Sequence, residues 1–283
     1  MNVVDAHHHV WDLAVRDQEW LADPELAPIR RDFSLADLAP QARAAGVVGT
    51  VLVQTVTVPE ETPELLALAA GWADGALVAG VVGWSDLCDP AIAENLAALR
   101  ELPGGARLSG IRHQVQGEPD PHWLLRPDVL RGLAAVAAAG LAYDLVILPH
   151  QLPAATRAAA LLPQLTFVLD HLAKPPIAAG ETEPWAARLR EFAALPNTTA
   201  KLSGLVTEAD RRRWSPADLR PYTEIALESF GPGRLMFGSD WPVCTLAAGY
   251  GRVLGTAAEL TGGLSEPERA AVFAGTARRV YGL

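Results

Sequence analysis

Three consecutive histidines stand near the start of the chain, in the run VDAHHHVWD. Imidazole is the side chain that most readily binds a metal ion or transfers a proton near neutral pH. The three are too few for an affinity tag, and they continue an apolar run. Because successive side chains of a strand point to opposite faces, His7 and His9 share one face with Asp5 below them. The spacing predicts that this pair acts on one ion or one ligand, and that His8 is structural.

Other chemically active residues also follow short apolar runs. His113, His150 and His171 stand near the ends of three such runs, Asp240 ends another, and only His122 lies in a connection. In a barrel of parallel strands, catalytic side chains project from the carboxyl ends of the strands. Histidines that only pack or face solvent would be scattered along the chain, so their clustering at strand ends predicts an enzyme. The predicted catalytic residues are His7, His9, His171 and Asp240.

A further set of polar and aromatic residues near strand ends suits a polyhydroxylated ligand, which needs many donors and acceptors. The predicted substrate-binding residues are Trp84, Arg112, Gln114, Lys174, Lys201 and Trp241. The two tryptophans suit either a pocket wall or packing at the barrel rim. Lys174 suits either a substrate contact or a solvated loop charge. Asp144 and Asp170 are predicted to be structural or supporting residues.

The elements that must position these residues form a repeating pattern of strand and helix. Eight short apolar runs, mostly continuous rather than alternating, are typical of strands covered on both faces. They span residues 2–10, 47–55, 76–84, 107–115, 141–150, 165–175, 197–205 and 234–243. Helical patterns include 34–46, 126–140, 215–231 and 265–282, with Ser215 and Ser265 as candidate N-caps. This pattern and the length of 283 residues predict one domain over residues 1–283, a (β/α)8 barrel with an extra C-terminal helix.

An open doubly wound sheet is the alternative to a barrel. It is disfavoured because no glycine-rich phosphate-binding motif follows any strand. The long connection 11–33 after the first strand is predicted to be functional, as long barrel loops usually are.

Composition narrows the class of partner. The formal net charge is −10, which disfavours nucleic acid and anionic membranes as partners. Cys88 and Cys244 are the only cysteines, and the chain shows no signal peptide and no apolar run of 18 residues. These features predict a cytoplasmic protein that acts on a small molecule, and they leave open whether it forms a homo-oligomer.

Several motifs together resemble a known family. The stretches DAHHHVWD, GIRHQVQGEPD, VLDHLAKPPI, AKLSGLVTEAD, LMFGSDWPVC and GTARRVYGL, in this order, resemble the amidohydrolase family 2 branch of the amidohydrolase superfamily. Within it, the likeness is to sugar-lactone hydrolases such as L-fuconolactonase and L-rhamnonolactonase. The resemblance covers essentially the whole chain. It implies a distorted (β/α)8 barrel with its active site at the carboxyl ends of the strands.

The resemblance also bears on metal binding. Mononuclear members of the superfamily bind their ion through residues that correspond here to His7, His9, His150 and Asp240. The fourth strand ends in IRHQV and offers no lysine for the bridge of a two-metal site. Several lactonase relatives work without a required metal. The expectation is therefore either no cofactor or one divalent metal, with zinc as the first candidate.

A lactone is an internal ester, and its hydrolysis needs a base for water and an electrophile for the carbonyl oxygen. We expect Asp240 to be the general base, with His7, His9 and His171 around the water and the carbonyl. An amide, with its poorer leaving group, would more readily require a metal. The alternatives are a zinc-dependent decarboxylase or an amide hydrolase of the same superfamily, and a non-catalytic carbohydrate-binding barrel.

Overall fold

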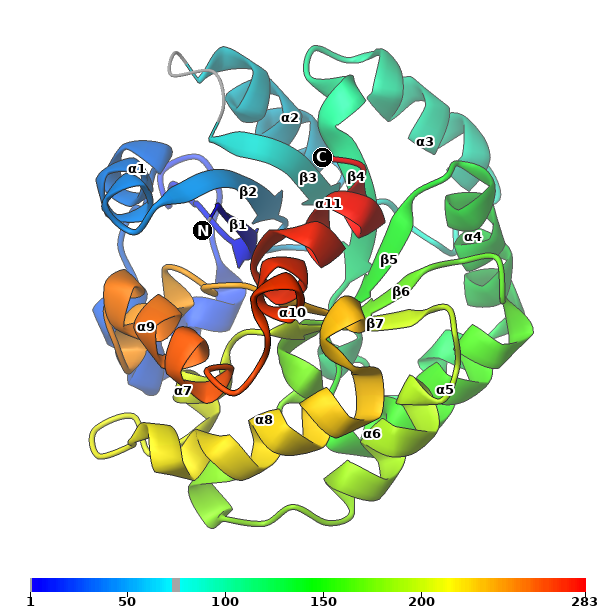
Figure 1. Ribbon diagram of the computed structural model, residues 1–283. Coiled ribbons are helices and arrows are strands. Elements are labelled where there is room, and N and C mark those ends of the chain that lie inside the picture. Colours follow the sequence, from blue (N-terminus) through cyan, green and yellow to red (C-terminus); the bar gives the residue numbers. More distant parts are fainter. Residues whose placement is uncertain (1, 73–76) are drawn as a thin grey trace.

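Eight parallel strands form a ring that is covered by helices in the computed structural model, which describes residues 2–72 and 77–283 (Figure 1). The strands pair in chain order, and one bridge between His8 and Trp241 brings the last strand against the first. The strands are β1 (Val3–His8), β2 (Val47–Val53), β3 (Val78–Gly83), β4 (Leu108–His113), β5 (Ala142–Leu145), β6 (Phe167–Leu169), β7 (Thr198–Leu202) and β8 (Leu235–Phe237). The predicted (β/α)8 barrel is confirmed, with strands shorter than the apolar runs. Residue 76, at the start of the third run, lies outside the described residues.

Helices follow the strands around the outside of the barrel. They are α1 (Leu35–Ala44), α2 (Glu61–Gly71), α3 (Ile92–Glu101), α4 (Pro127–Ala138), α5 (Leu152–Leu161), α6 (Trp185–Ala193), α7 (Leu205–Glu208), α8 (Pro216–Phe230) and α9 (Tyr250–Leu260). The cap predicted before α8 is present: the backbone N–H and hydroxyl of Ser215 both donate to the Asp218 carboxylate. No helix among the described residues is long and apolar enough to cross a membrane.

The C-terminal segment closes one end of the barrel. The predicted helix over 265–282 consists of α10 (Glu266–Ala270), a π-helical turn over Ala271–Gly275 and α11 (Thr276–Tyr281). Figure 1 shows α10 and α11 lying across the middle of the ring of strands. Buried side chains of the π-helical turn and α11, Ala274, Ala277 and Tyr281, pack against an inner core of mostly small and β-branched residues from the strands. A larger core lies between the strands and the outer helices.

A β-bulge in β1 changes which of its side chains face the barrel interior. The pairing with β2 runs from Asp5 opposite Thr50 to His8 opposite Leu52, so β1 advances three residues while β2 advances two. The bulge places both Ala6, which belongs to the inner core, and His7, its neighbour in the chain, inside the barrel.

The bulge overturns the predicted position of Asp5 below the histidines. The Asp5 carboxylate instead accepts a hydrogen bond of 2.9 Å from the Tyr250 hydroxyl, which comes from α9 outside the barrel. It also accepts from the backbone N–H groups of His7 and Ser239. His8 points away from the interior, as predicted, with its Nε2 2.9 Å from the Thr50 hydroxyl.

Candidate active site

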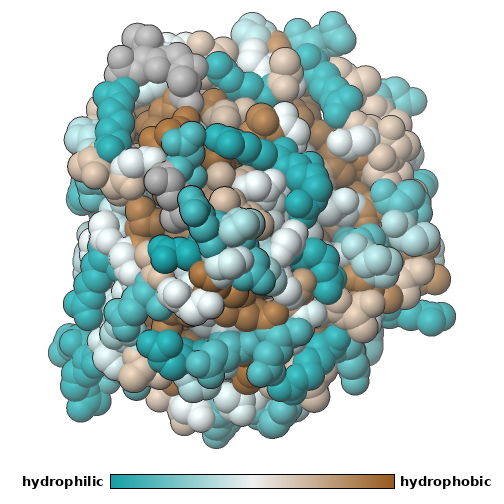
Figure 2. Space-filling model, viewed as in Figure 1, coloured by the Kyte–Doolittle hydropathy of each residue, from teal (hydrophilic) through white to brown (hydrophobic). Residues whose placement is uncertain are grey.

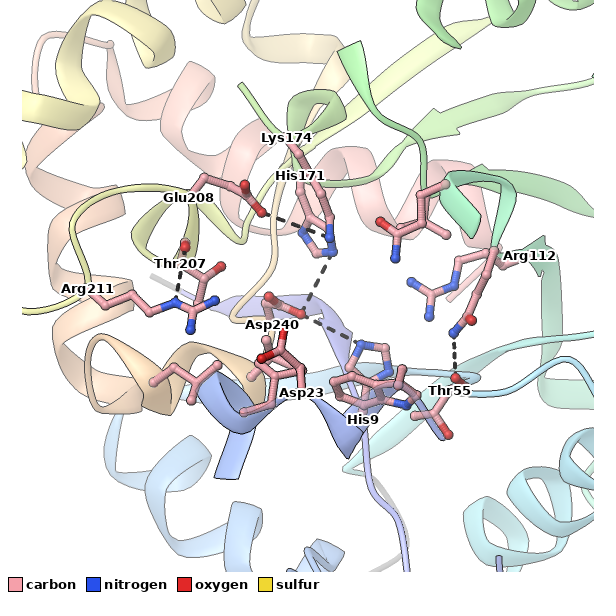
Figure 3. Close-up of a pocket in the computed structure, with 17 residues that line it drawn as sticks. His9, Asp23, Thr55, Arg112, His171, Lys174, Thr207, Glu208, Arg211 and Asp240 are labelled. Carbon is pink, nitrogen blue, oxygen red and sulfur yellow. Dashed lines mark hydrogen bonds and ion pairs between the residues drawn. The ribbon is translucent and has the colours of Figure 1, made fainter. Parts of the chain in front are cut away.

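A pocket of about 330 Å³ opens at the carboxyl ends of the strands (Figure 3). Asp240 and two histidines line its centre, and Figure 3 shows Arg112 on one side of Asp240, with Glu208 and Lys174 on another. The position agrees with the rule that barrel enzymes place their chemistry at this end.

One carboxylate oxygen is the common point of the site. Asp240 Oδ1 lies 3.8 Å from His7 Nε2, 3.7 Å from His9 Nε2 and 3.8 Å from His171 Nε2. All four side chains are buried, with at most 7% of any side chain exposed. The structure thus brings the four predicted catalytic residues together, although they come from three different strand ends.

The backbone around the site is held in an unfavourable conformation. Among the described residues, the non-glycine positions with positive φ are Asp240 and the four consecutive residues His171–Lys174, with φ between 51° and 59°. Each such residue costs about 1–2 kcal/mol. The turn persists because Leu172 and Ala173 are fully buried and the Trp185 indole donates to the Leu172 carbonyl. Such concentrated strain is typical of a functional site.

Two glycines make room for the imidazole rings. A Cβ atom on Gly204, whose φ is +67°, would lie 2.6 Å from His171 Nδ1. A Cβ atom on Gly238 would lie 2.7 Å from the Cβ of His7. Both separations are too short for real side chains, so the rings reach their positions only because these residues lack a Cβ.

Hydrogen bonds on the far side of each ring orient the histidines. His9 Nδ1 donates to the Val53 carbonyl at 2.8 Å, which leaves a lone pair on its Nε2. His9 Nε2 lies 3.1 Å from His7 Nε2, so in this arrangement His7 Nε2 donates and its Nδ1 accepts from the Lys201 ammonium at 3.1 Å. His171 Nδ1 pairs with the Ser203 hydroxyl at 2.8 Å.

A charge-balanced cluster lies beneath the pocket floor. Lys201 Nζ is 2.5 Å from Asp144 and 3.0 Å from Asp170, and Asp170 also pairs with Arg112 at 3.0 Å. The Tyr281 hydroxyl donates to Asp144 at 2.8 Å. Two cations thus face two carboxylates, as buried charges require.

The structure therefore corrects the prediction that Lys201 binds substrate. Its side chain points into the barrel, as the strand parity implies, but it stands two residues below Ser203 and is completely enclosed. It supports His7 rather than lining the pocket.

Four other predicted residues also lie outside the pocket lining: His7, which is fully buried, and Trp84, Trp241 and His150. The Trp84 indole donates to His113 Nδ1 at 3.0 Å and so connects the residue that follows β3 to the end of β4. Trp241 is 2% exposed and packs edge-to-face on Phe33, which is the rim-packing alternative. His150 is exposed in the 3-10 turn Pro149–Gln151 and does not belong to the cluster of potential ligands, where His171 takes its place.

The remaining predicted substrate contacts do line the pocket: Arg112, Gln114 and Lys174. Arg112 is held by Asp170 and by the Gln54 side-chain oxygen, which its Nη2 contacts at 2.9 Å. Gln114 donates to the Thr55 carbonyl.

Several residues of the pocket wall are not among the predicted site residues. Trp20 and Leu26 lie in two 3-10 helices of the long connection 11–33, which is predicted to be functional, and Asp23 lies between these helices. Glu208 and Arg211 follow β7, where the motif AKLSGLVTEAD indicated only the strand end.

Burial and neighbouring charges set the protonation of the site. Burial lowers the pKa of His7 well below its ordinary value and that of His171 to about 4. Burial raises the pKa of the Asp240 carboxyl, but His171 and His9 outweigh this effect and hold it below its ordinary value. Near neutral pH the site therefore combines an ionised Asp240 carboxylate with neutral imidazoles of His7 and His171, which suits general base chemistry.

His7, His171 and Asp240 present ligand atoms within 4.8 Å of one another, a grouping that fits a zinc ion and that His9 adjoins. Four ligands at the usual 2.0–2.1 Å in tetrahedral geometry are about 3.3 Å apart. His7 Nε2 and His9 Nε2 are 3.1 Å apart, and Asp240 Oδ1 is 3.7–3.8 Å from the three imidazoles. Three imidazole nitrogens and a carboxylate oxygen are ligands that zinc accepts. His7 can take part when Asp170, 3.4 Å from its Nδ1, accepts the proton there instead.

Known proteins are similar to this chain in sequence and in structure. L-fucono-1,5-lactonase from Burkholderia multivorans is 40% identical over 99% of this chain and 96% of its own length. L-fucono-1,5-lactonase from Burkholderia ambifaria is 39% identical over 98% and 94%. A crystal structure of an amidohydrolase from Burkholderia multivorans with bound zinc has 39% identity and a TM-score of 0.91, with both chains covered completely.

The family model for amidohydrolases matches residues 4–283, from the first strand to the C-terminal helix. The match includes every residue that converges on Asp240. The chain belongs to the amidohydrolase family.

Proposed function

We propose that the protein hydrolyses lactones of sugar acids, of the L-fucono-1,5-lactone type. The observation that carries the proposal is the convergence of three buried imidazoles on the ionised Asp240 in a polar pocket. The relatives at 39–40% identity that are named L-fucono-1,5-lactonase support the substrate class.

In the proposed mechanism Asp240 takes a proton from water as the water oxygen attacks the lactone carbonyl carbon. The ring C–O bond then breaks, and the Asp240 carboxylic acid returns the proton to the departing alkoxide oxygen. The product is an open-chain hydroxy acid. General base help of this kind contributes about 10²–10⁴-fold to the rate.

Charge that develops on the carbonyl oxygen needs a preorganised partner. Arg112 lies beside the site, with its Nη1 3.4 Å from His7 Nε2, and its guanidinium is fixed by Gln54 and Asp170. It can stabilise the oxyanion together with an imidazole N–H. The carboxylate of the product would meet the same positive charge.

His7, His9, His171 and Asp240 would hold a divalent metal, whose chemistry when bound is to acidify water and polarise a carbonyl. Whether or not an ion is present, the strained turn and the buried cluster position the same side chains. The four residues would therefore hold zinc, and the proposed ester hydrolysis does not depend on it.

The experiment is a substrate screen with purified protein, in which a pH indicator follows acid release from lactones, and CO₂ and ammonia are measured directly for the other substrates. The panel holds sugar lactones, an aryl carboxylate for CO₂ release and a small amide, each with and without chelator. We expect hydrolysis of sugar lactones alone. Turnover of the aryl acid or amide without lactone turnover would assign a different reaction, and no turnover in the panel would favour the non-catalytic alternative.

A further inference from the structure

One wall of the pocket carries an acid and a base whose charged atoms hold no hydrogen bond to any described residue. Glu208 ends α7, and Lys174 ends the strained turn after β6. Glu208 Oε1 lies 4.0 Å from Lys174 Nζ, which is beyond hydrogen-bond range. Their side chains are only 28% and 25% exposed, and both line the pocket (Figure 3).

The pair is fixed relative to the reacting centre. Lys174 follows His171 in the same left-handed turn, and α7 begins directly after Gly204, which packs on the His171 ring. Any substrate whose carbonyl lies at Asp240 would therefore meet the pair at a set distance. Figure 3 shows that Arg112 stands on the other side of Asp240.

The chemistry of the pair favours neutral hydroxyl groups over a carboxylate. A hydroxyl group can donate to the Glu208 carboxylate and accept from the Lys174 ammonium, which gives each charged group a hydrogen-bond partner. A substrate carboxylate near Lys174 would be repelled by Glu208. Over the whole pocket lining, Asp23 and Asp240 balance the charges of Arg112 and Arg211, so the lining has no excess of positive charge that would favour an anionic substrate.

We propose that Glu208 and Lys174 form the subsite for the hydroxyl groups of the substrate that lie away from the ester bond. This inference rests on the proposed lactonase function and adds to it the residues that select polyhydroxylated lactones. A site built to bind a hydroxyl group discriminates strongly against an analogue that lacks it, because the polar groups of the site stay unpaired.

The test measures one ratio: kcat/KM for L-fucono-1,5-lactone divided by kcat/KM for δ-valerolactone, which lacks hydroxyl groups. We expect Glu208→Gln and Lys174→Met each to lower this ratio about 10- to 100-fold, the worth of one hydrogen bond to a charged group. Glu64→Gln is the matched control, since Glu64 is also paired with a cation, Arg16, but lies outside this pocket.

The outcomes separate the two proposals. An unchanged ratio in both variants overturns the subsite while leaving the lactonase function intact. Failure of the wild-type protein to hydrolyse either lactone overturns the function itself. If δ-valerolactone turnover is too slow to measure, the two open-chain acids serve as competitive inhibitors of the sugar lactone, and their ratio of inhibition constants gives the same comparison.

Discussion

Asp240 Oδ1 lies 3.8 Å from His171 Nε2, too far for a direct hydrogen bond and close enough for both atoms to contact one reacting water. Both groups are held there by backbone in the left-handed region. The two side chains are therefore positioned to bind a ligand between them rather than to hydrogen-bond to each other.

Replacing Asp240 by Asn removes the proposed base without changing its shape. We expect kcat for the sugar lactone to fall about 10²–10⁴-fold. The melting temperature should change little, because the variant keeps the size of the side chain. Steady-state kinetics and thermal melts check this, and near-normal hydrolysis would contradict the assignment.

Zinc affinity should depend on His171 and not on His150. His171→Ala removes a proposed ligand and should weaken zinc binding beyond the roughly 10–100-fold expected for an outer-shell partner. His150→Ala, at an exposed position, should have no effect. Competition with a chromogenic chelator measures both, and equal affinities in the two variants would refute the proposed ligand set.

The hydroxyl of Tyr281 should stabilise the buried cluster. Tyr281→Phe removes a donor to the Asp144 carboxylate and should lower the free energy of unfolding by about 1.5–3 kcal/mol. Tyr222→Phe is the control, since the Tyr222 hydroxyl donates to a neutral carbonyl and its loss should cost about 0.5–1.5 kcal/mol. Urea unfolding compares the two, and an equal or smaller loss at Tyr281 would speak against the cluster.

The strain at Ala173 should appear when it is replaced by glycine. Ala173→Gly relieves about 1–2 kcal/mol of backbone strain and loses about 0.8 kcal/mol of buried methyl group, so stability should stay near that of the wild type. Ala158→Gly, also fully buried but inside α5, has no strain to relieve and should cost more than 1 kcal/mol. Equal losses in denaturant unfolding would show that the turn is not strained.

The acid limb of kcat/KM should report Glu208. Burial raises the pKa of its carboxyl, with Lys174 and Arg211 opposing the shift and Asp240 adding to it. Glu208 is ionised above its raised pKa, and protonation on lowering the pH removes the charged acceptor. We expect kcat/KM for the sugar lactone to fall at a pH above the ordinary glutamate pKa of about 4.3. A pH profile of Glu208→Gln should lack this limb, and an identical limb in both proteins would assign it elsewhere.

Much of this site was predictable from strand ends alone. The H-x-H spacing, His171 and Asp240 converge because a parallel barrel brings all carboxyl ends to one mouth. The alternation of side chains along a strand placed His8 and Lys201 on the correct faces. It could not show how far below the pocket a side chain lies, and Lys201 is enclosed because Asp144 and Asp170 surround it below the pocket floor.

The rest depends on contacts between segments that are distant in the sequence. The bulge in β1 arises where Asp5 accepts the N–H group of Ser239, a residue that follows β8. Glu208 lies in the pocket because the four-residue helix α7 follows β7 and ends at this residue. His150 lies outside the pocket because the chain forms a 3-10 turn after β5. No local pattern records these geometries.

The bulge in β1 also determines which residues would have to be transferred to build this site in another barrel. A regular strand bearing the same letters would put Asp5 inside the barrel, where a third carboxylate would upset the balance of Asp144 and Asp170 against two cations. The transferable unit is therefore Asp5–His9 together with Gly238, which gives His7 its space. A designer who copied only the two histidines would lack the bulge, held by Asp5, that turns both imidazoles into the barrel.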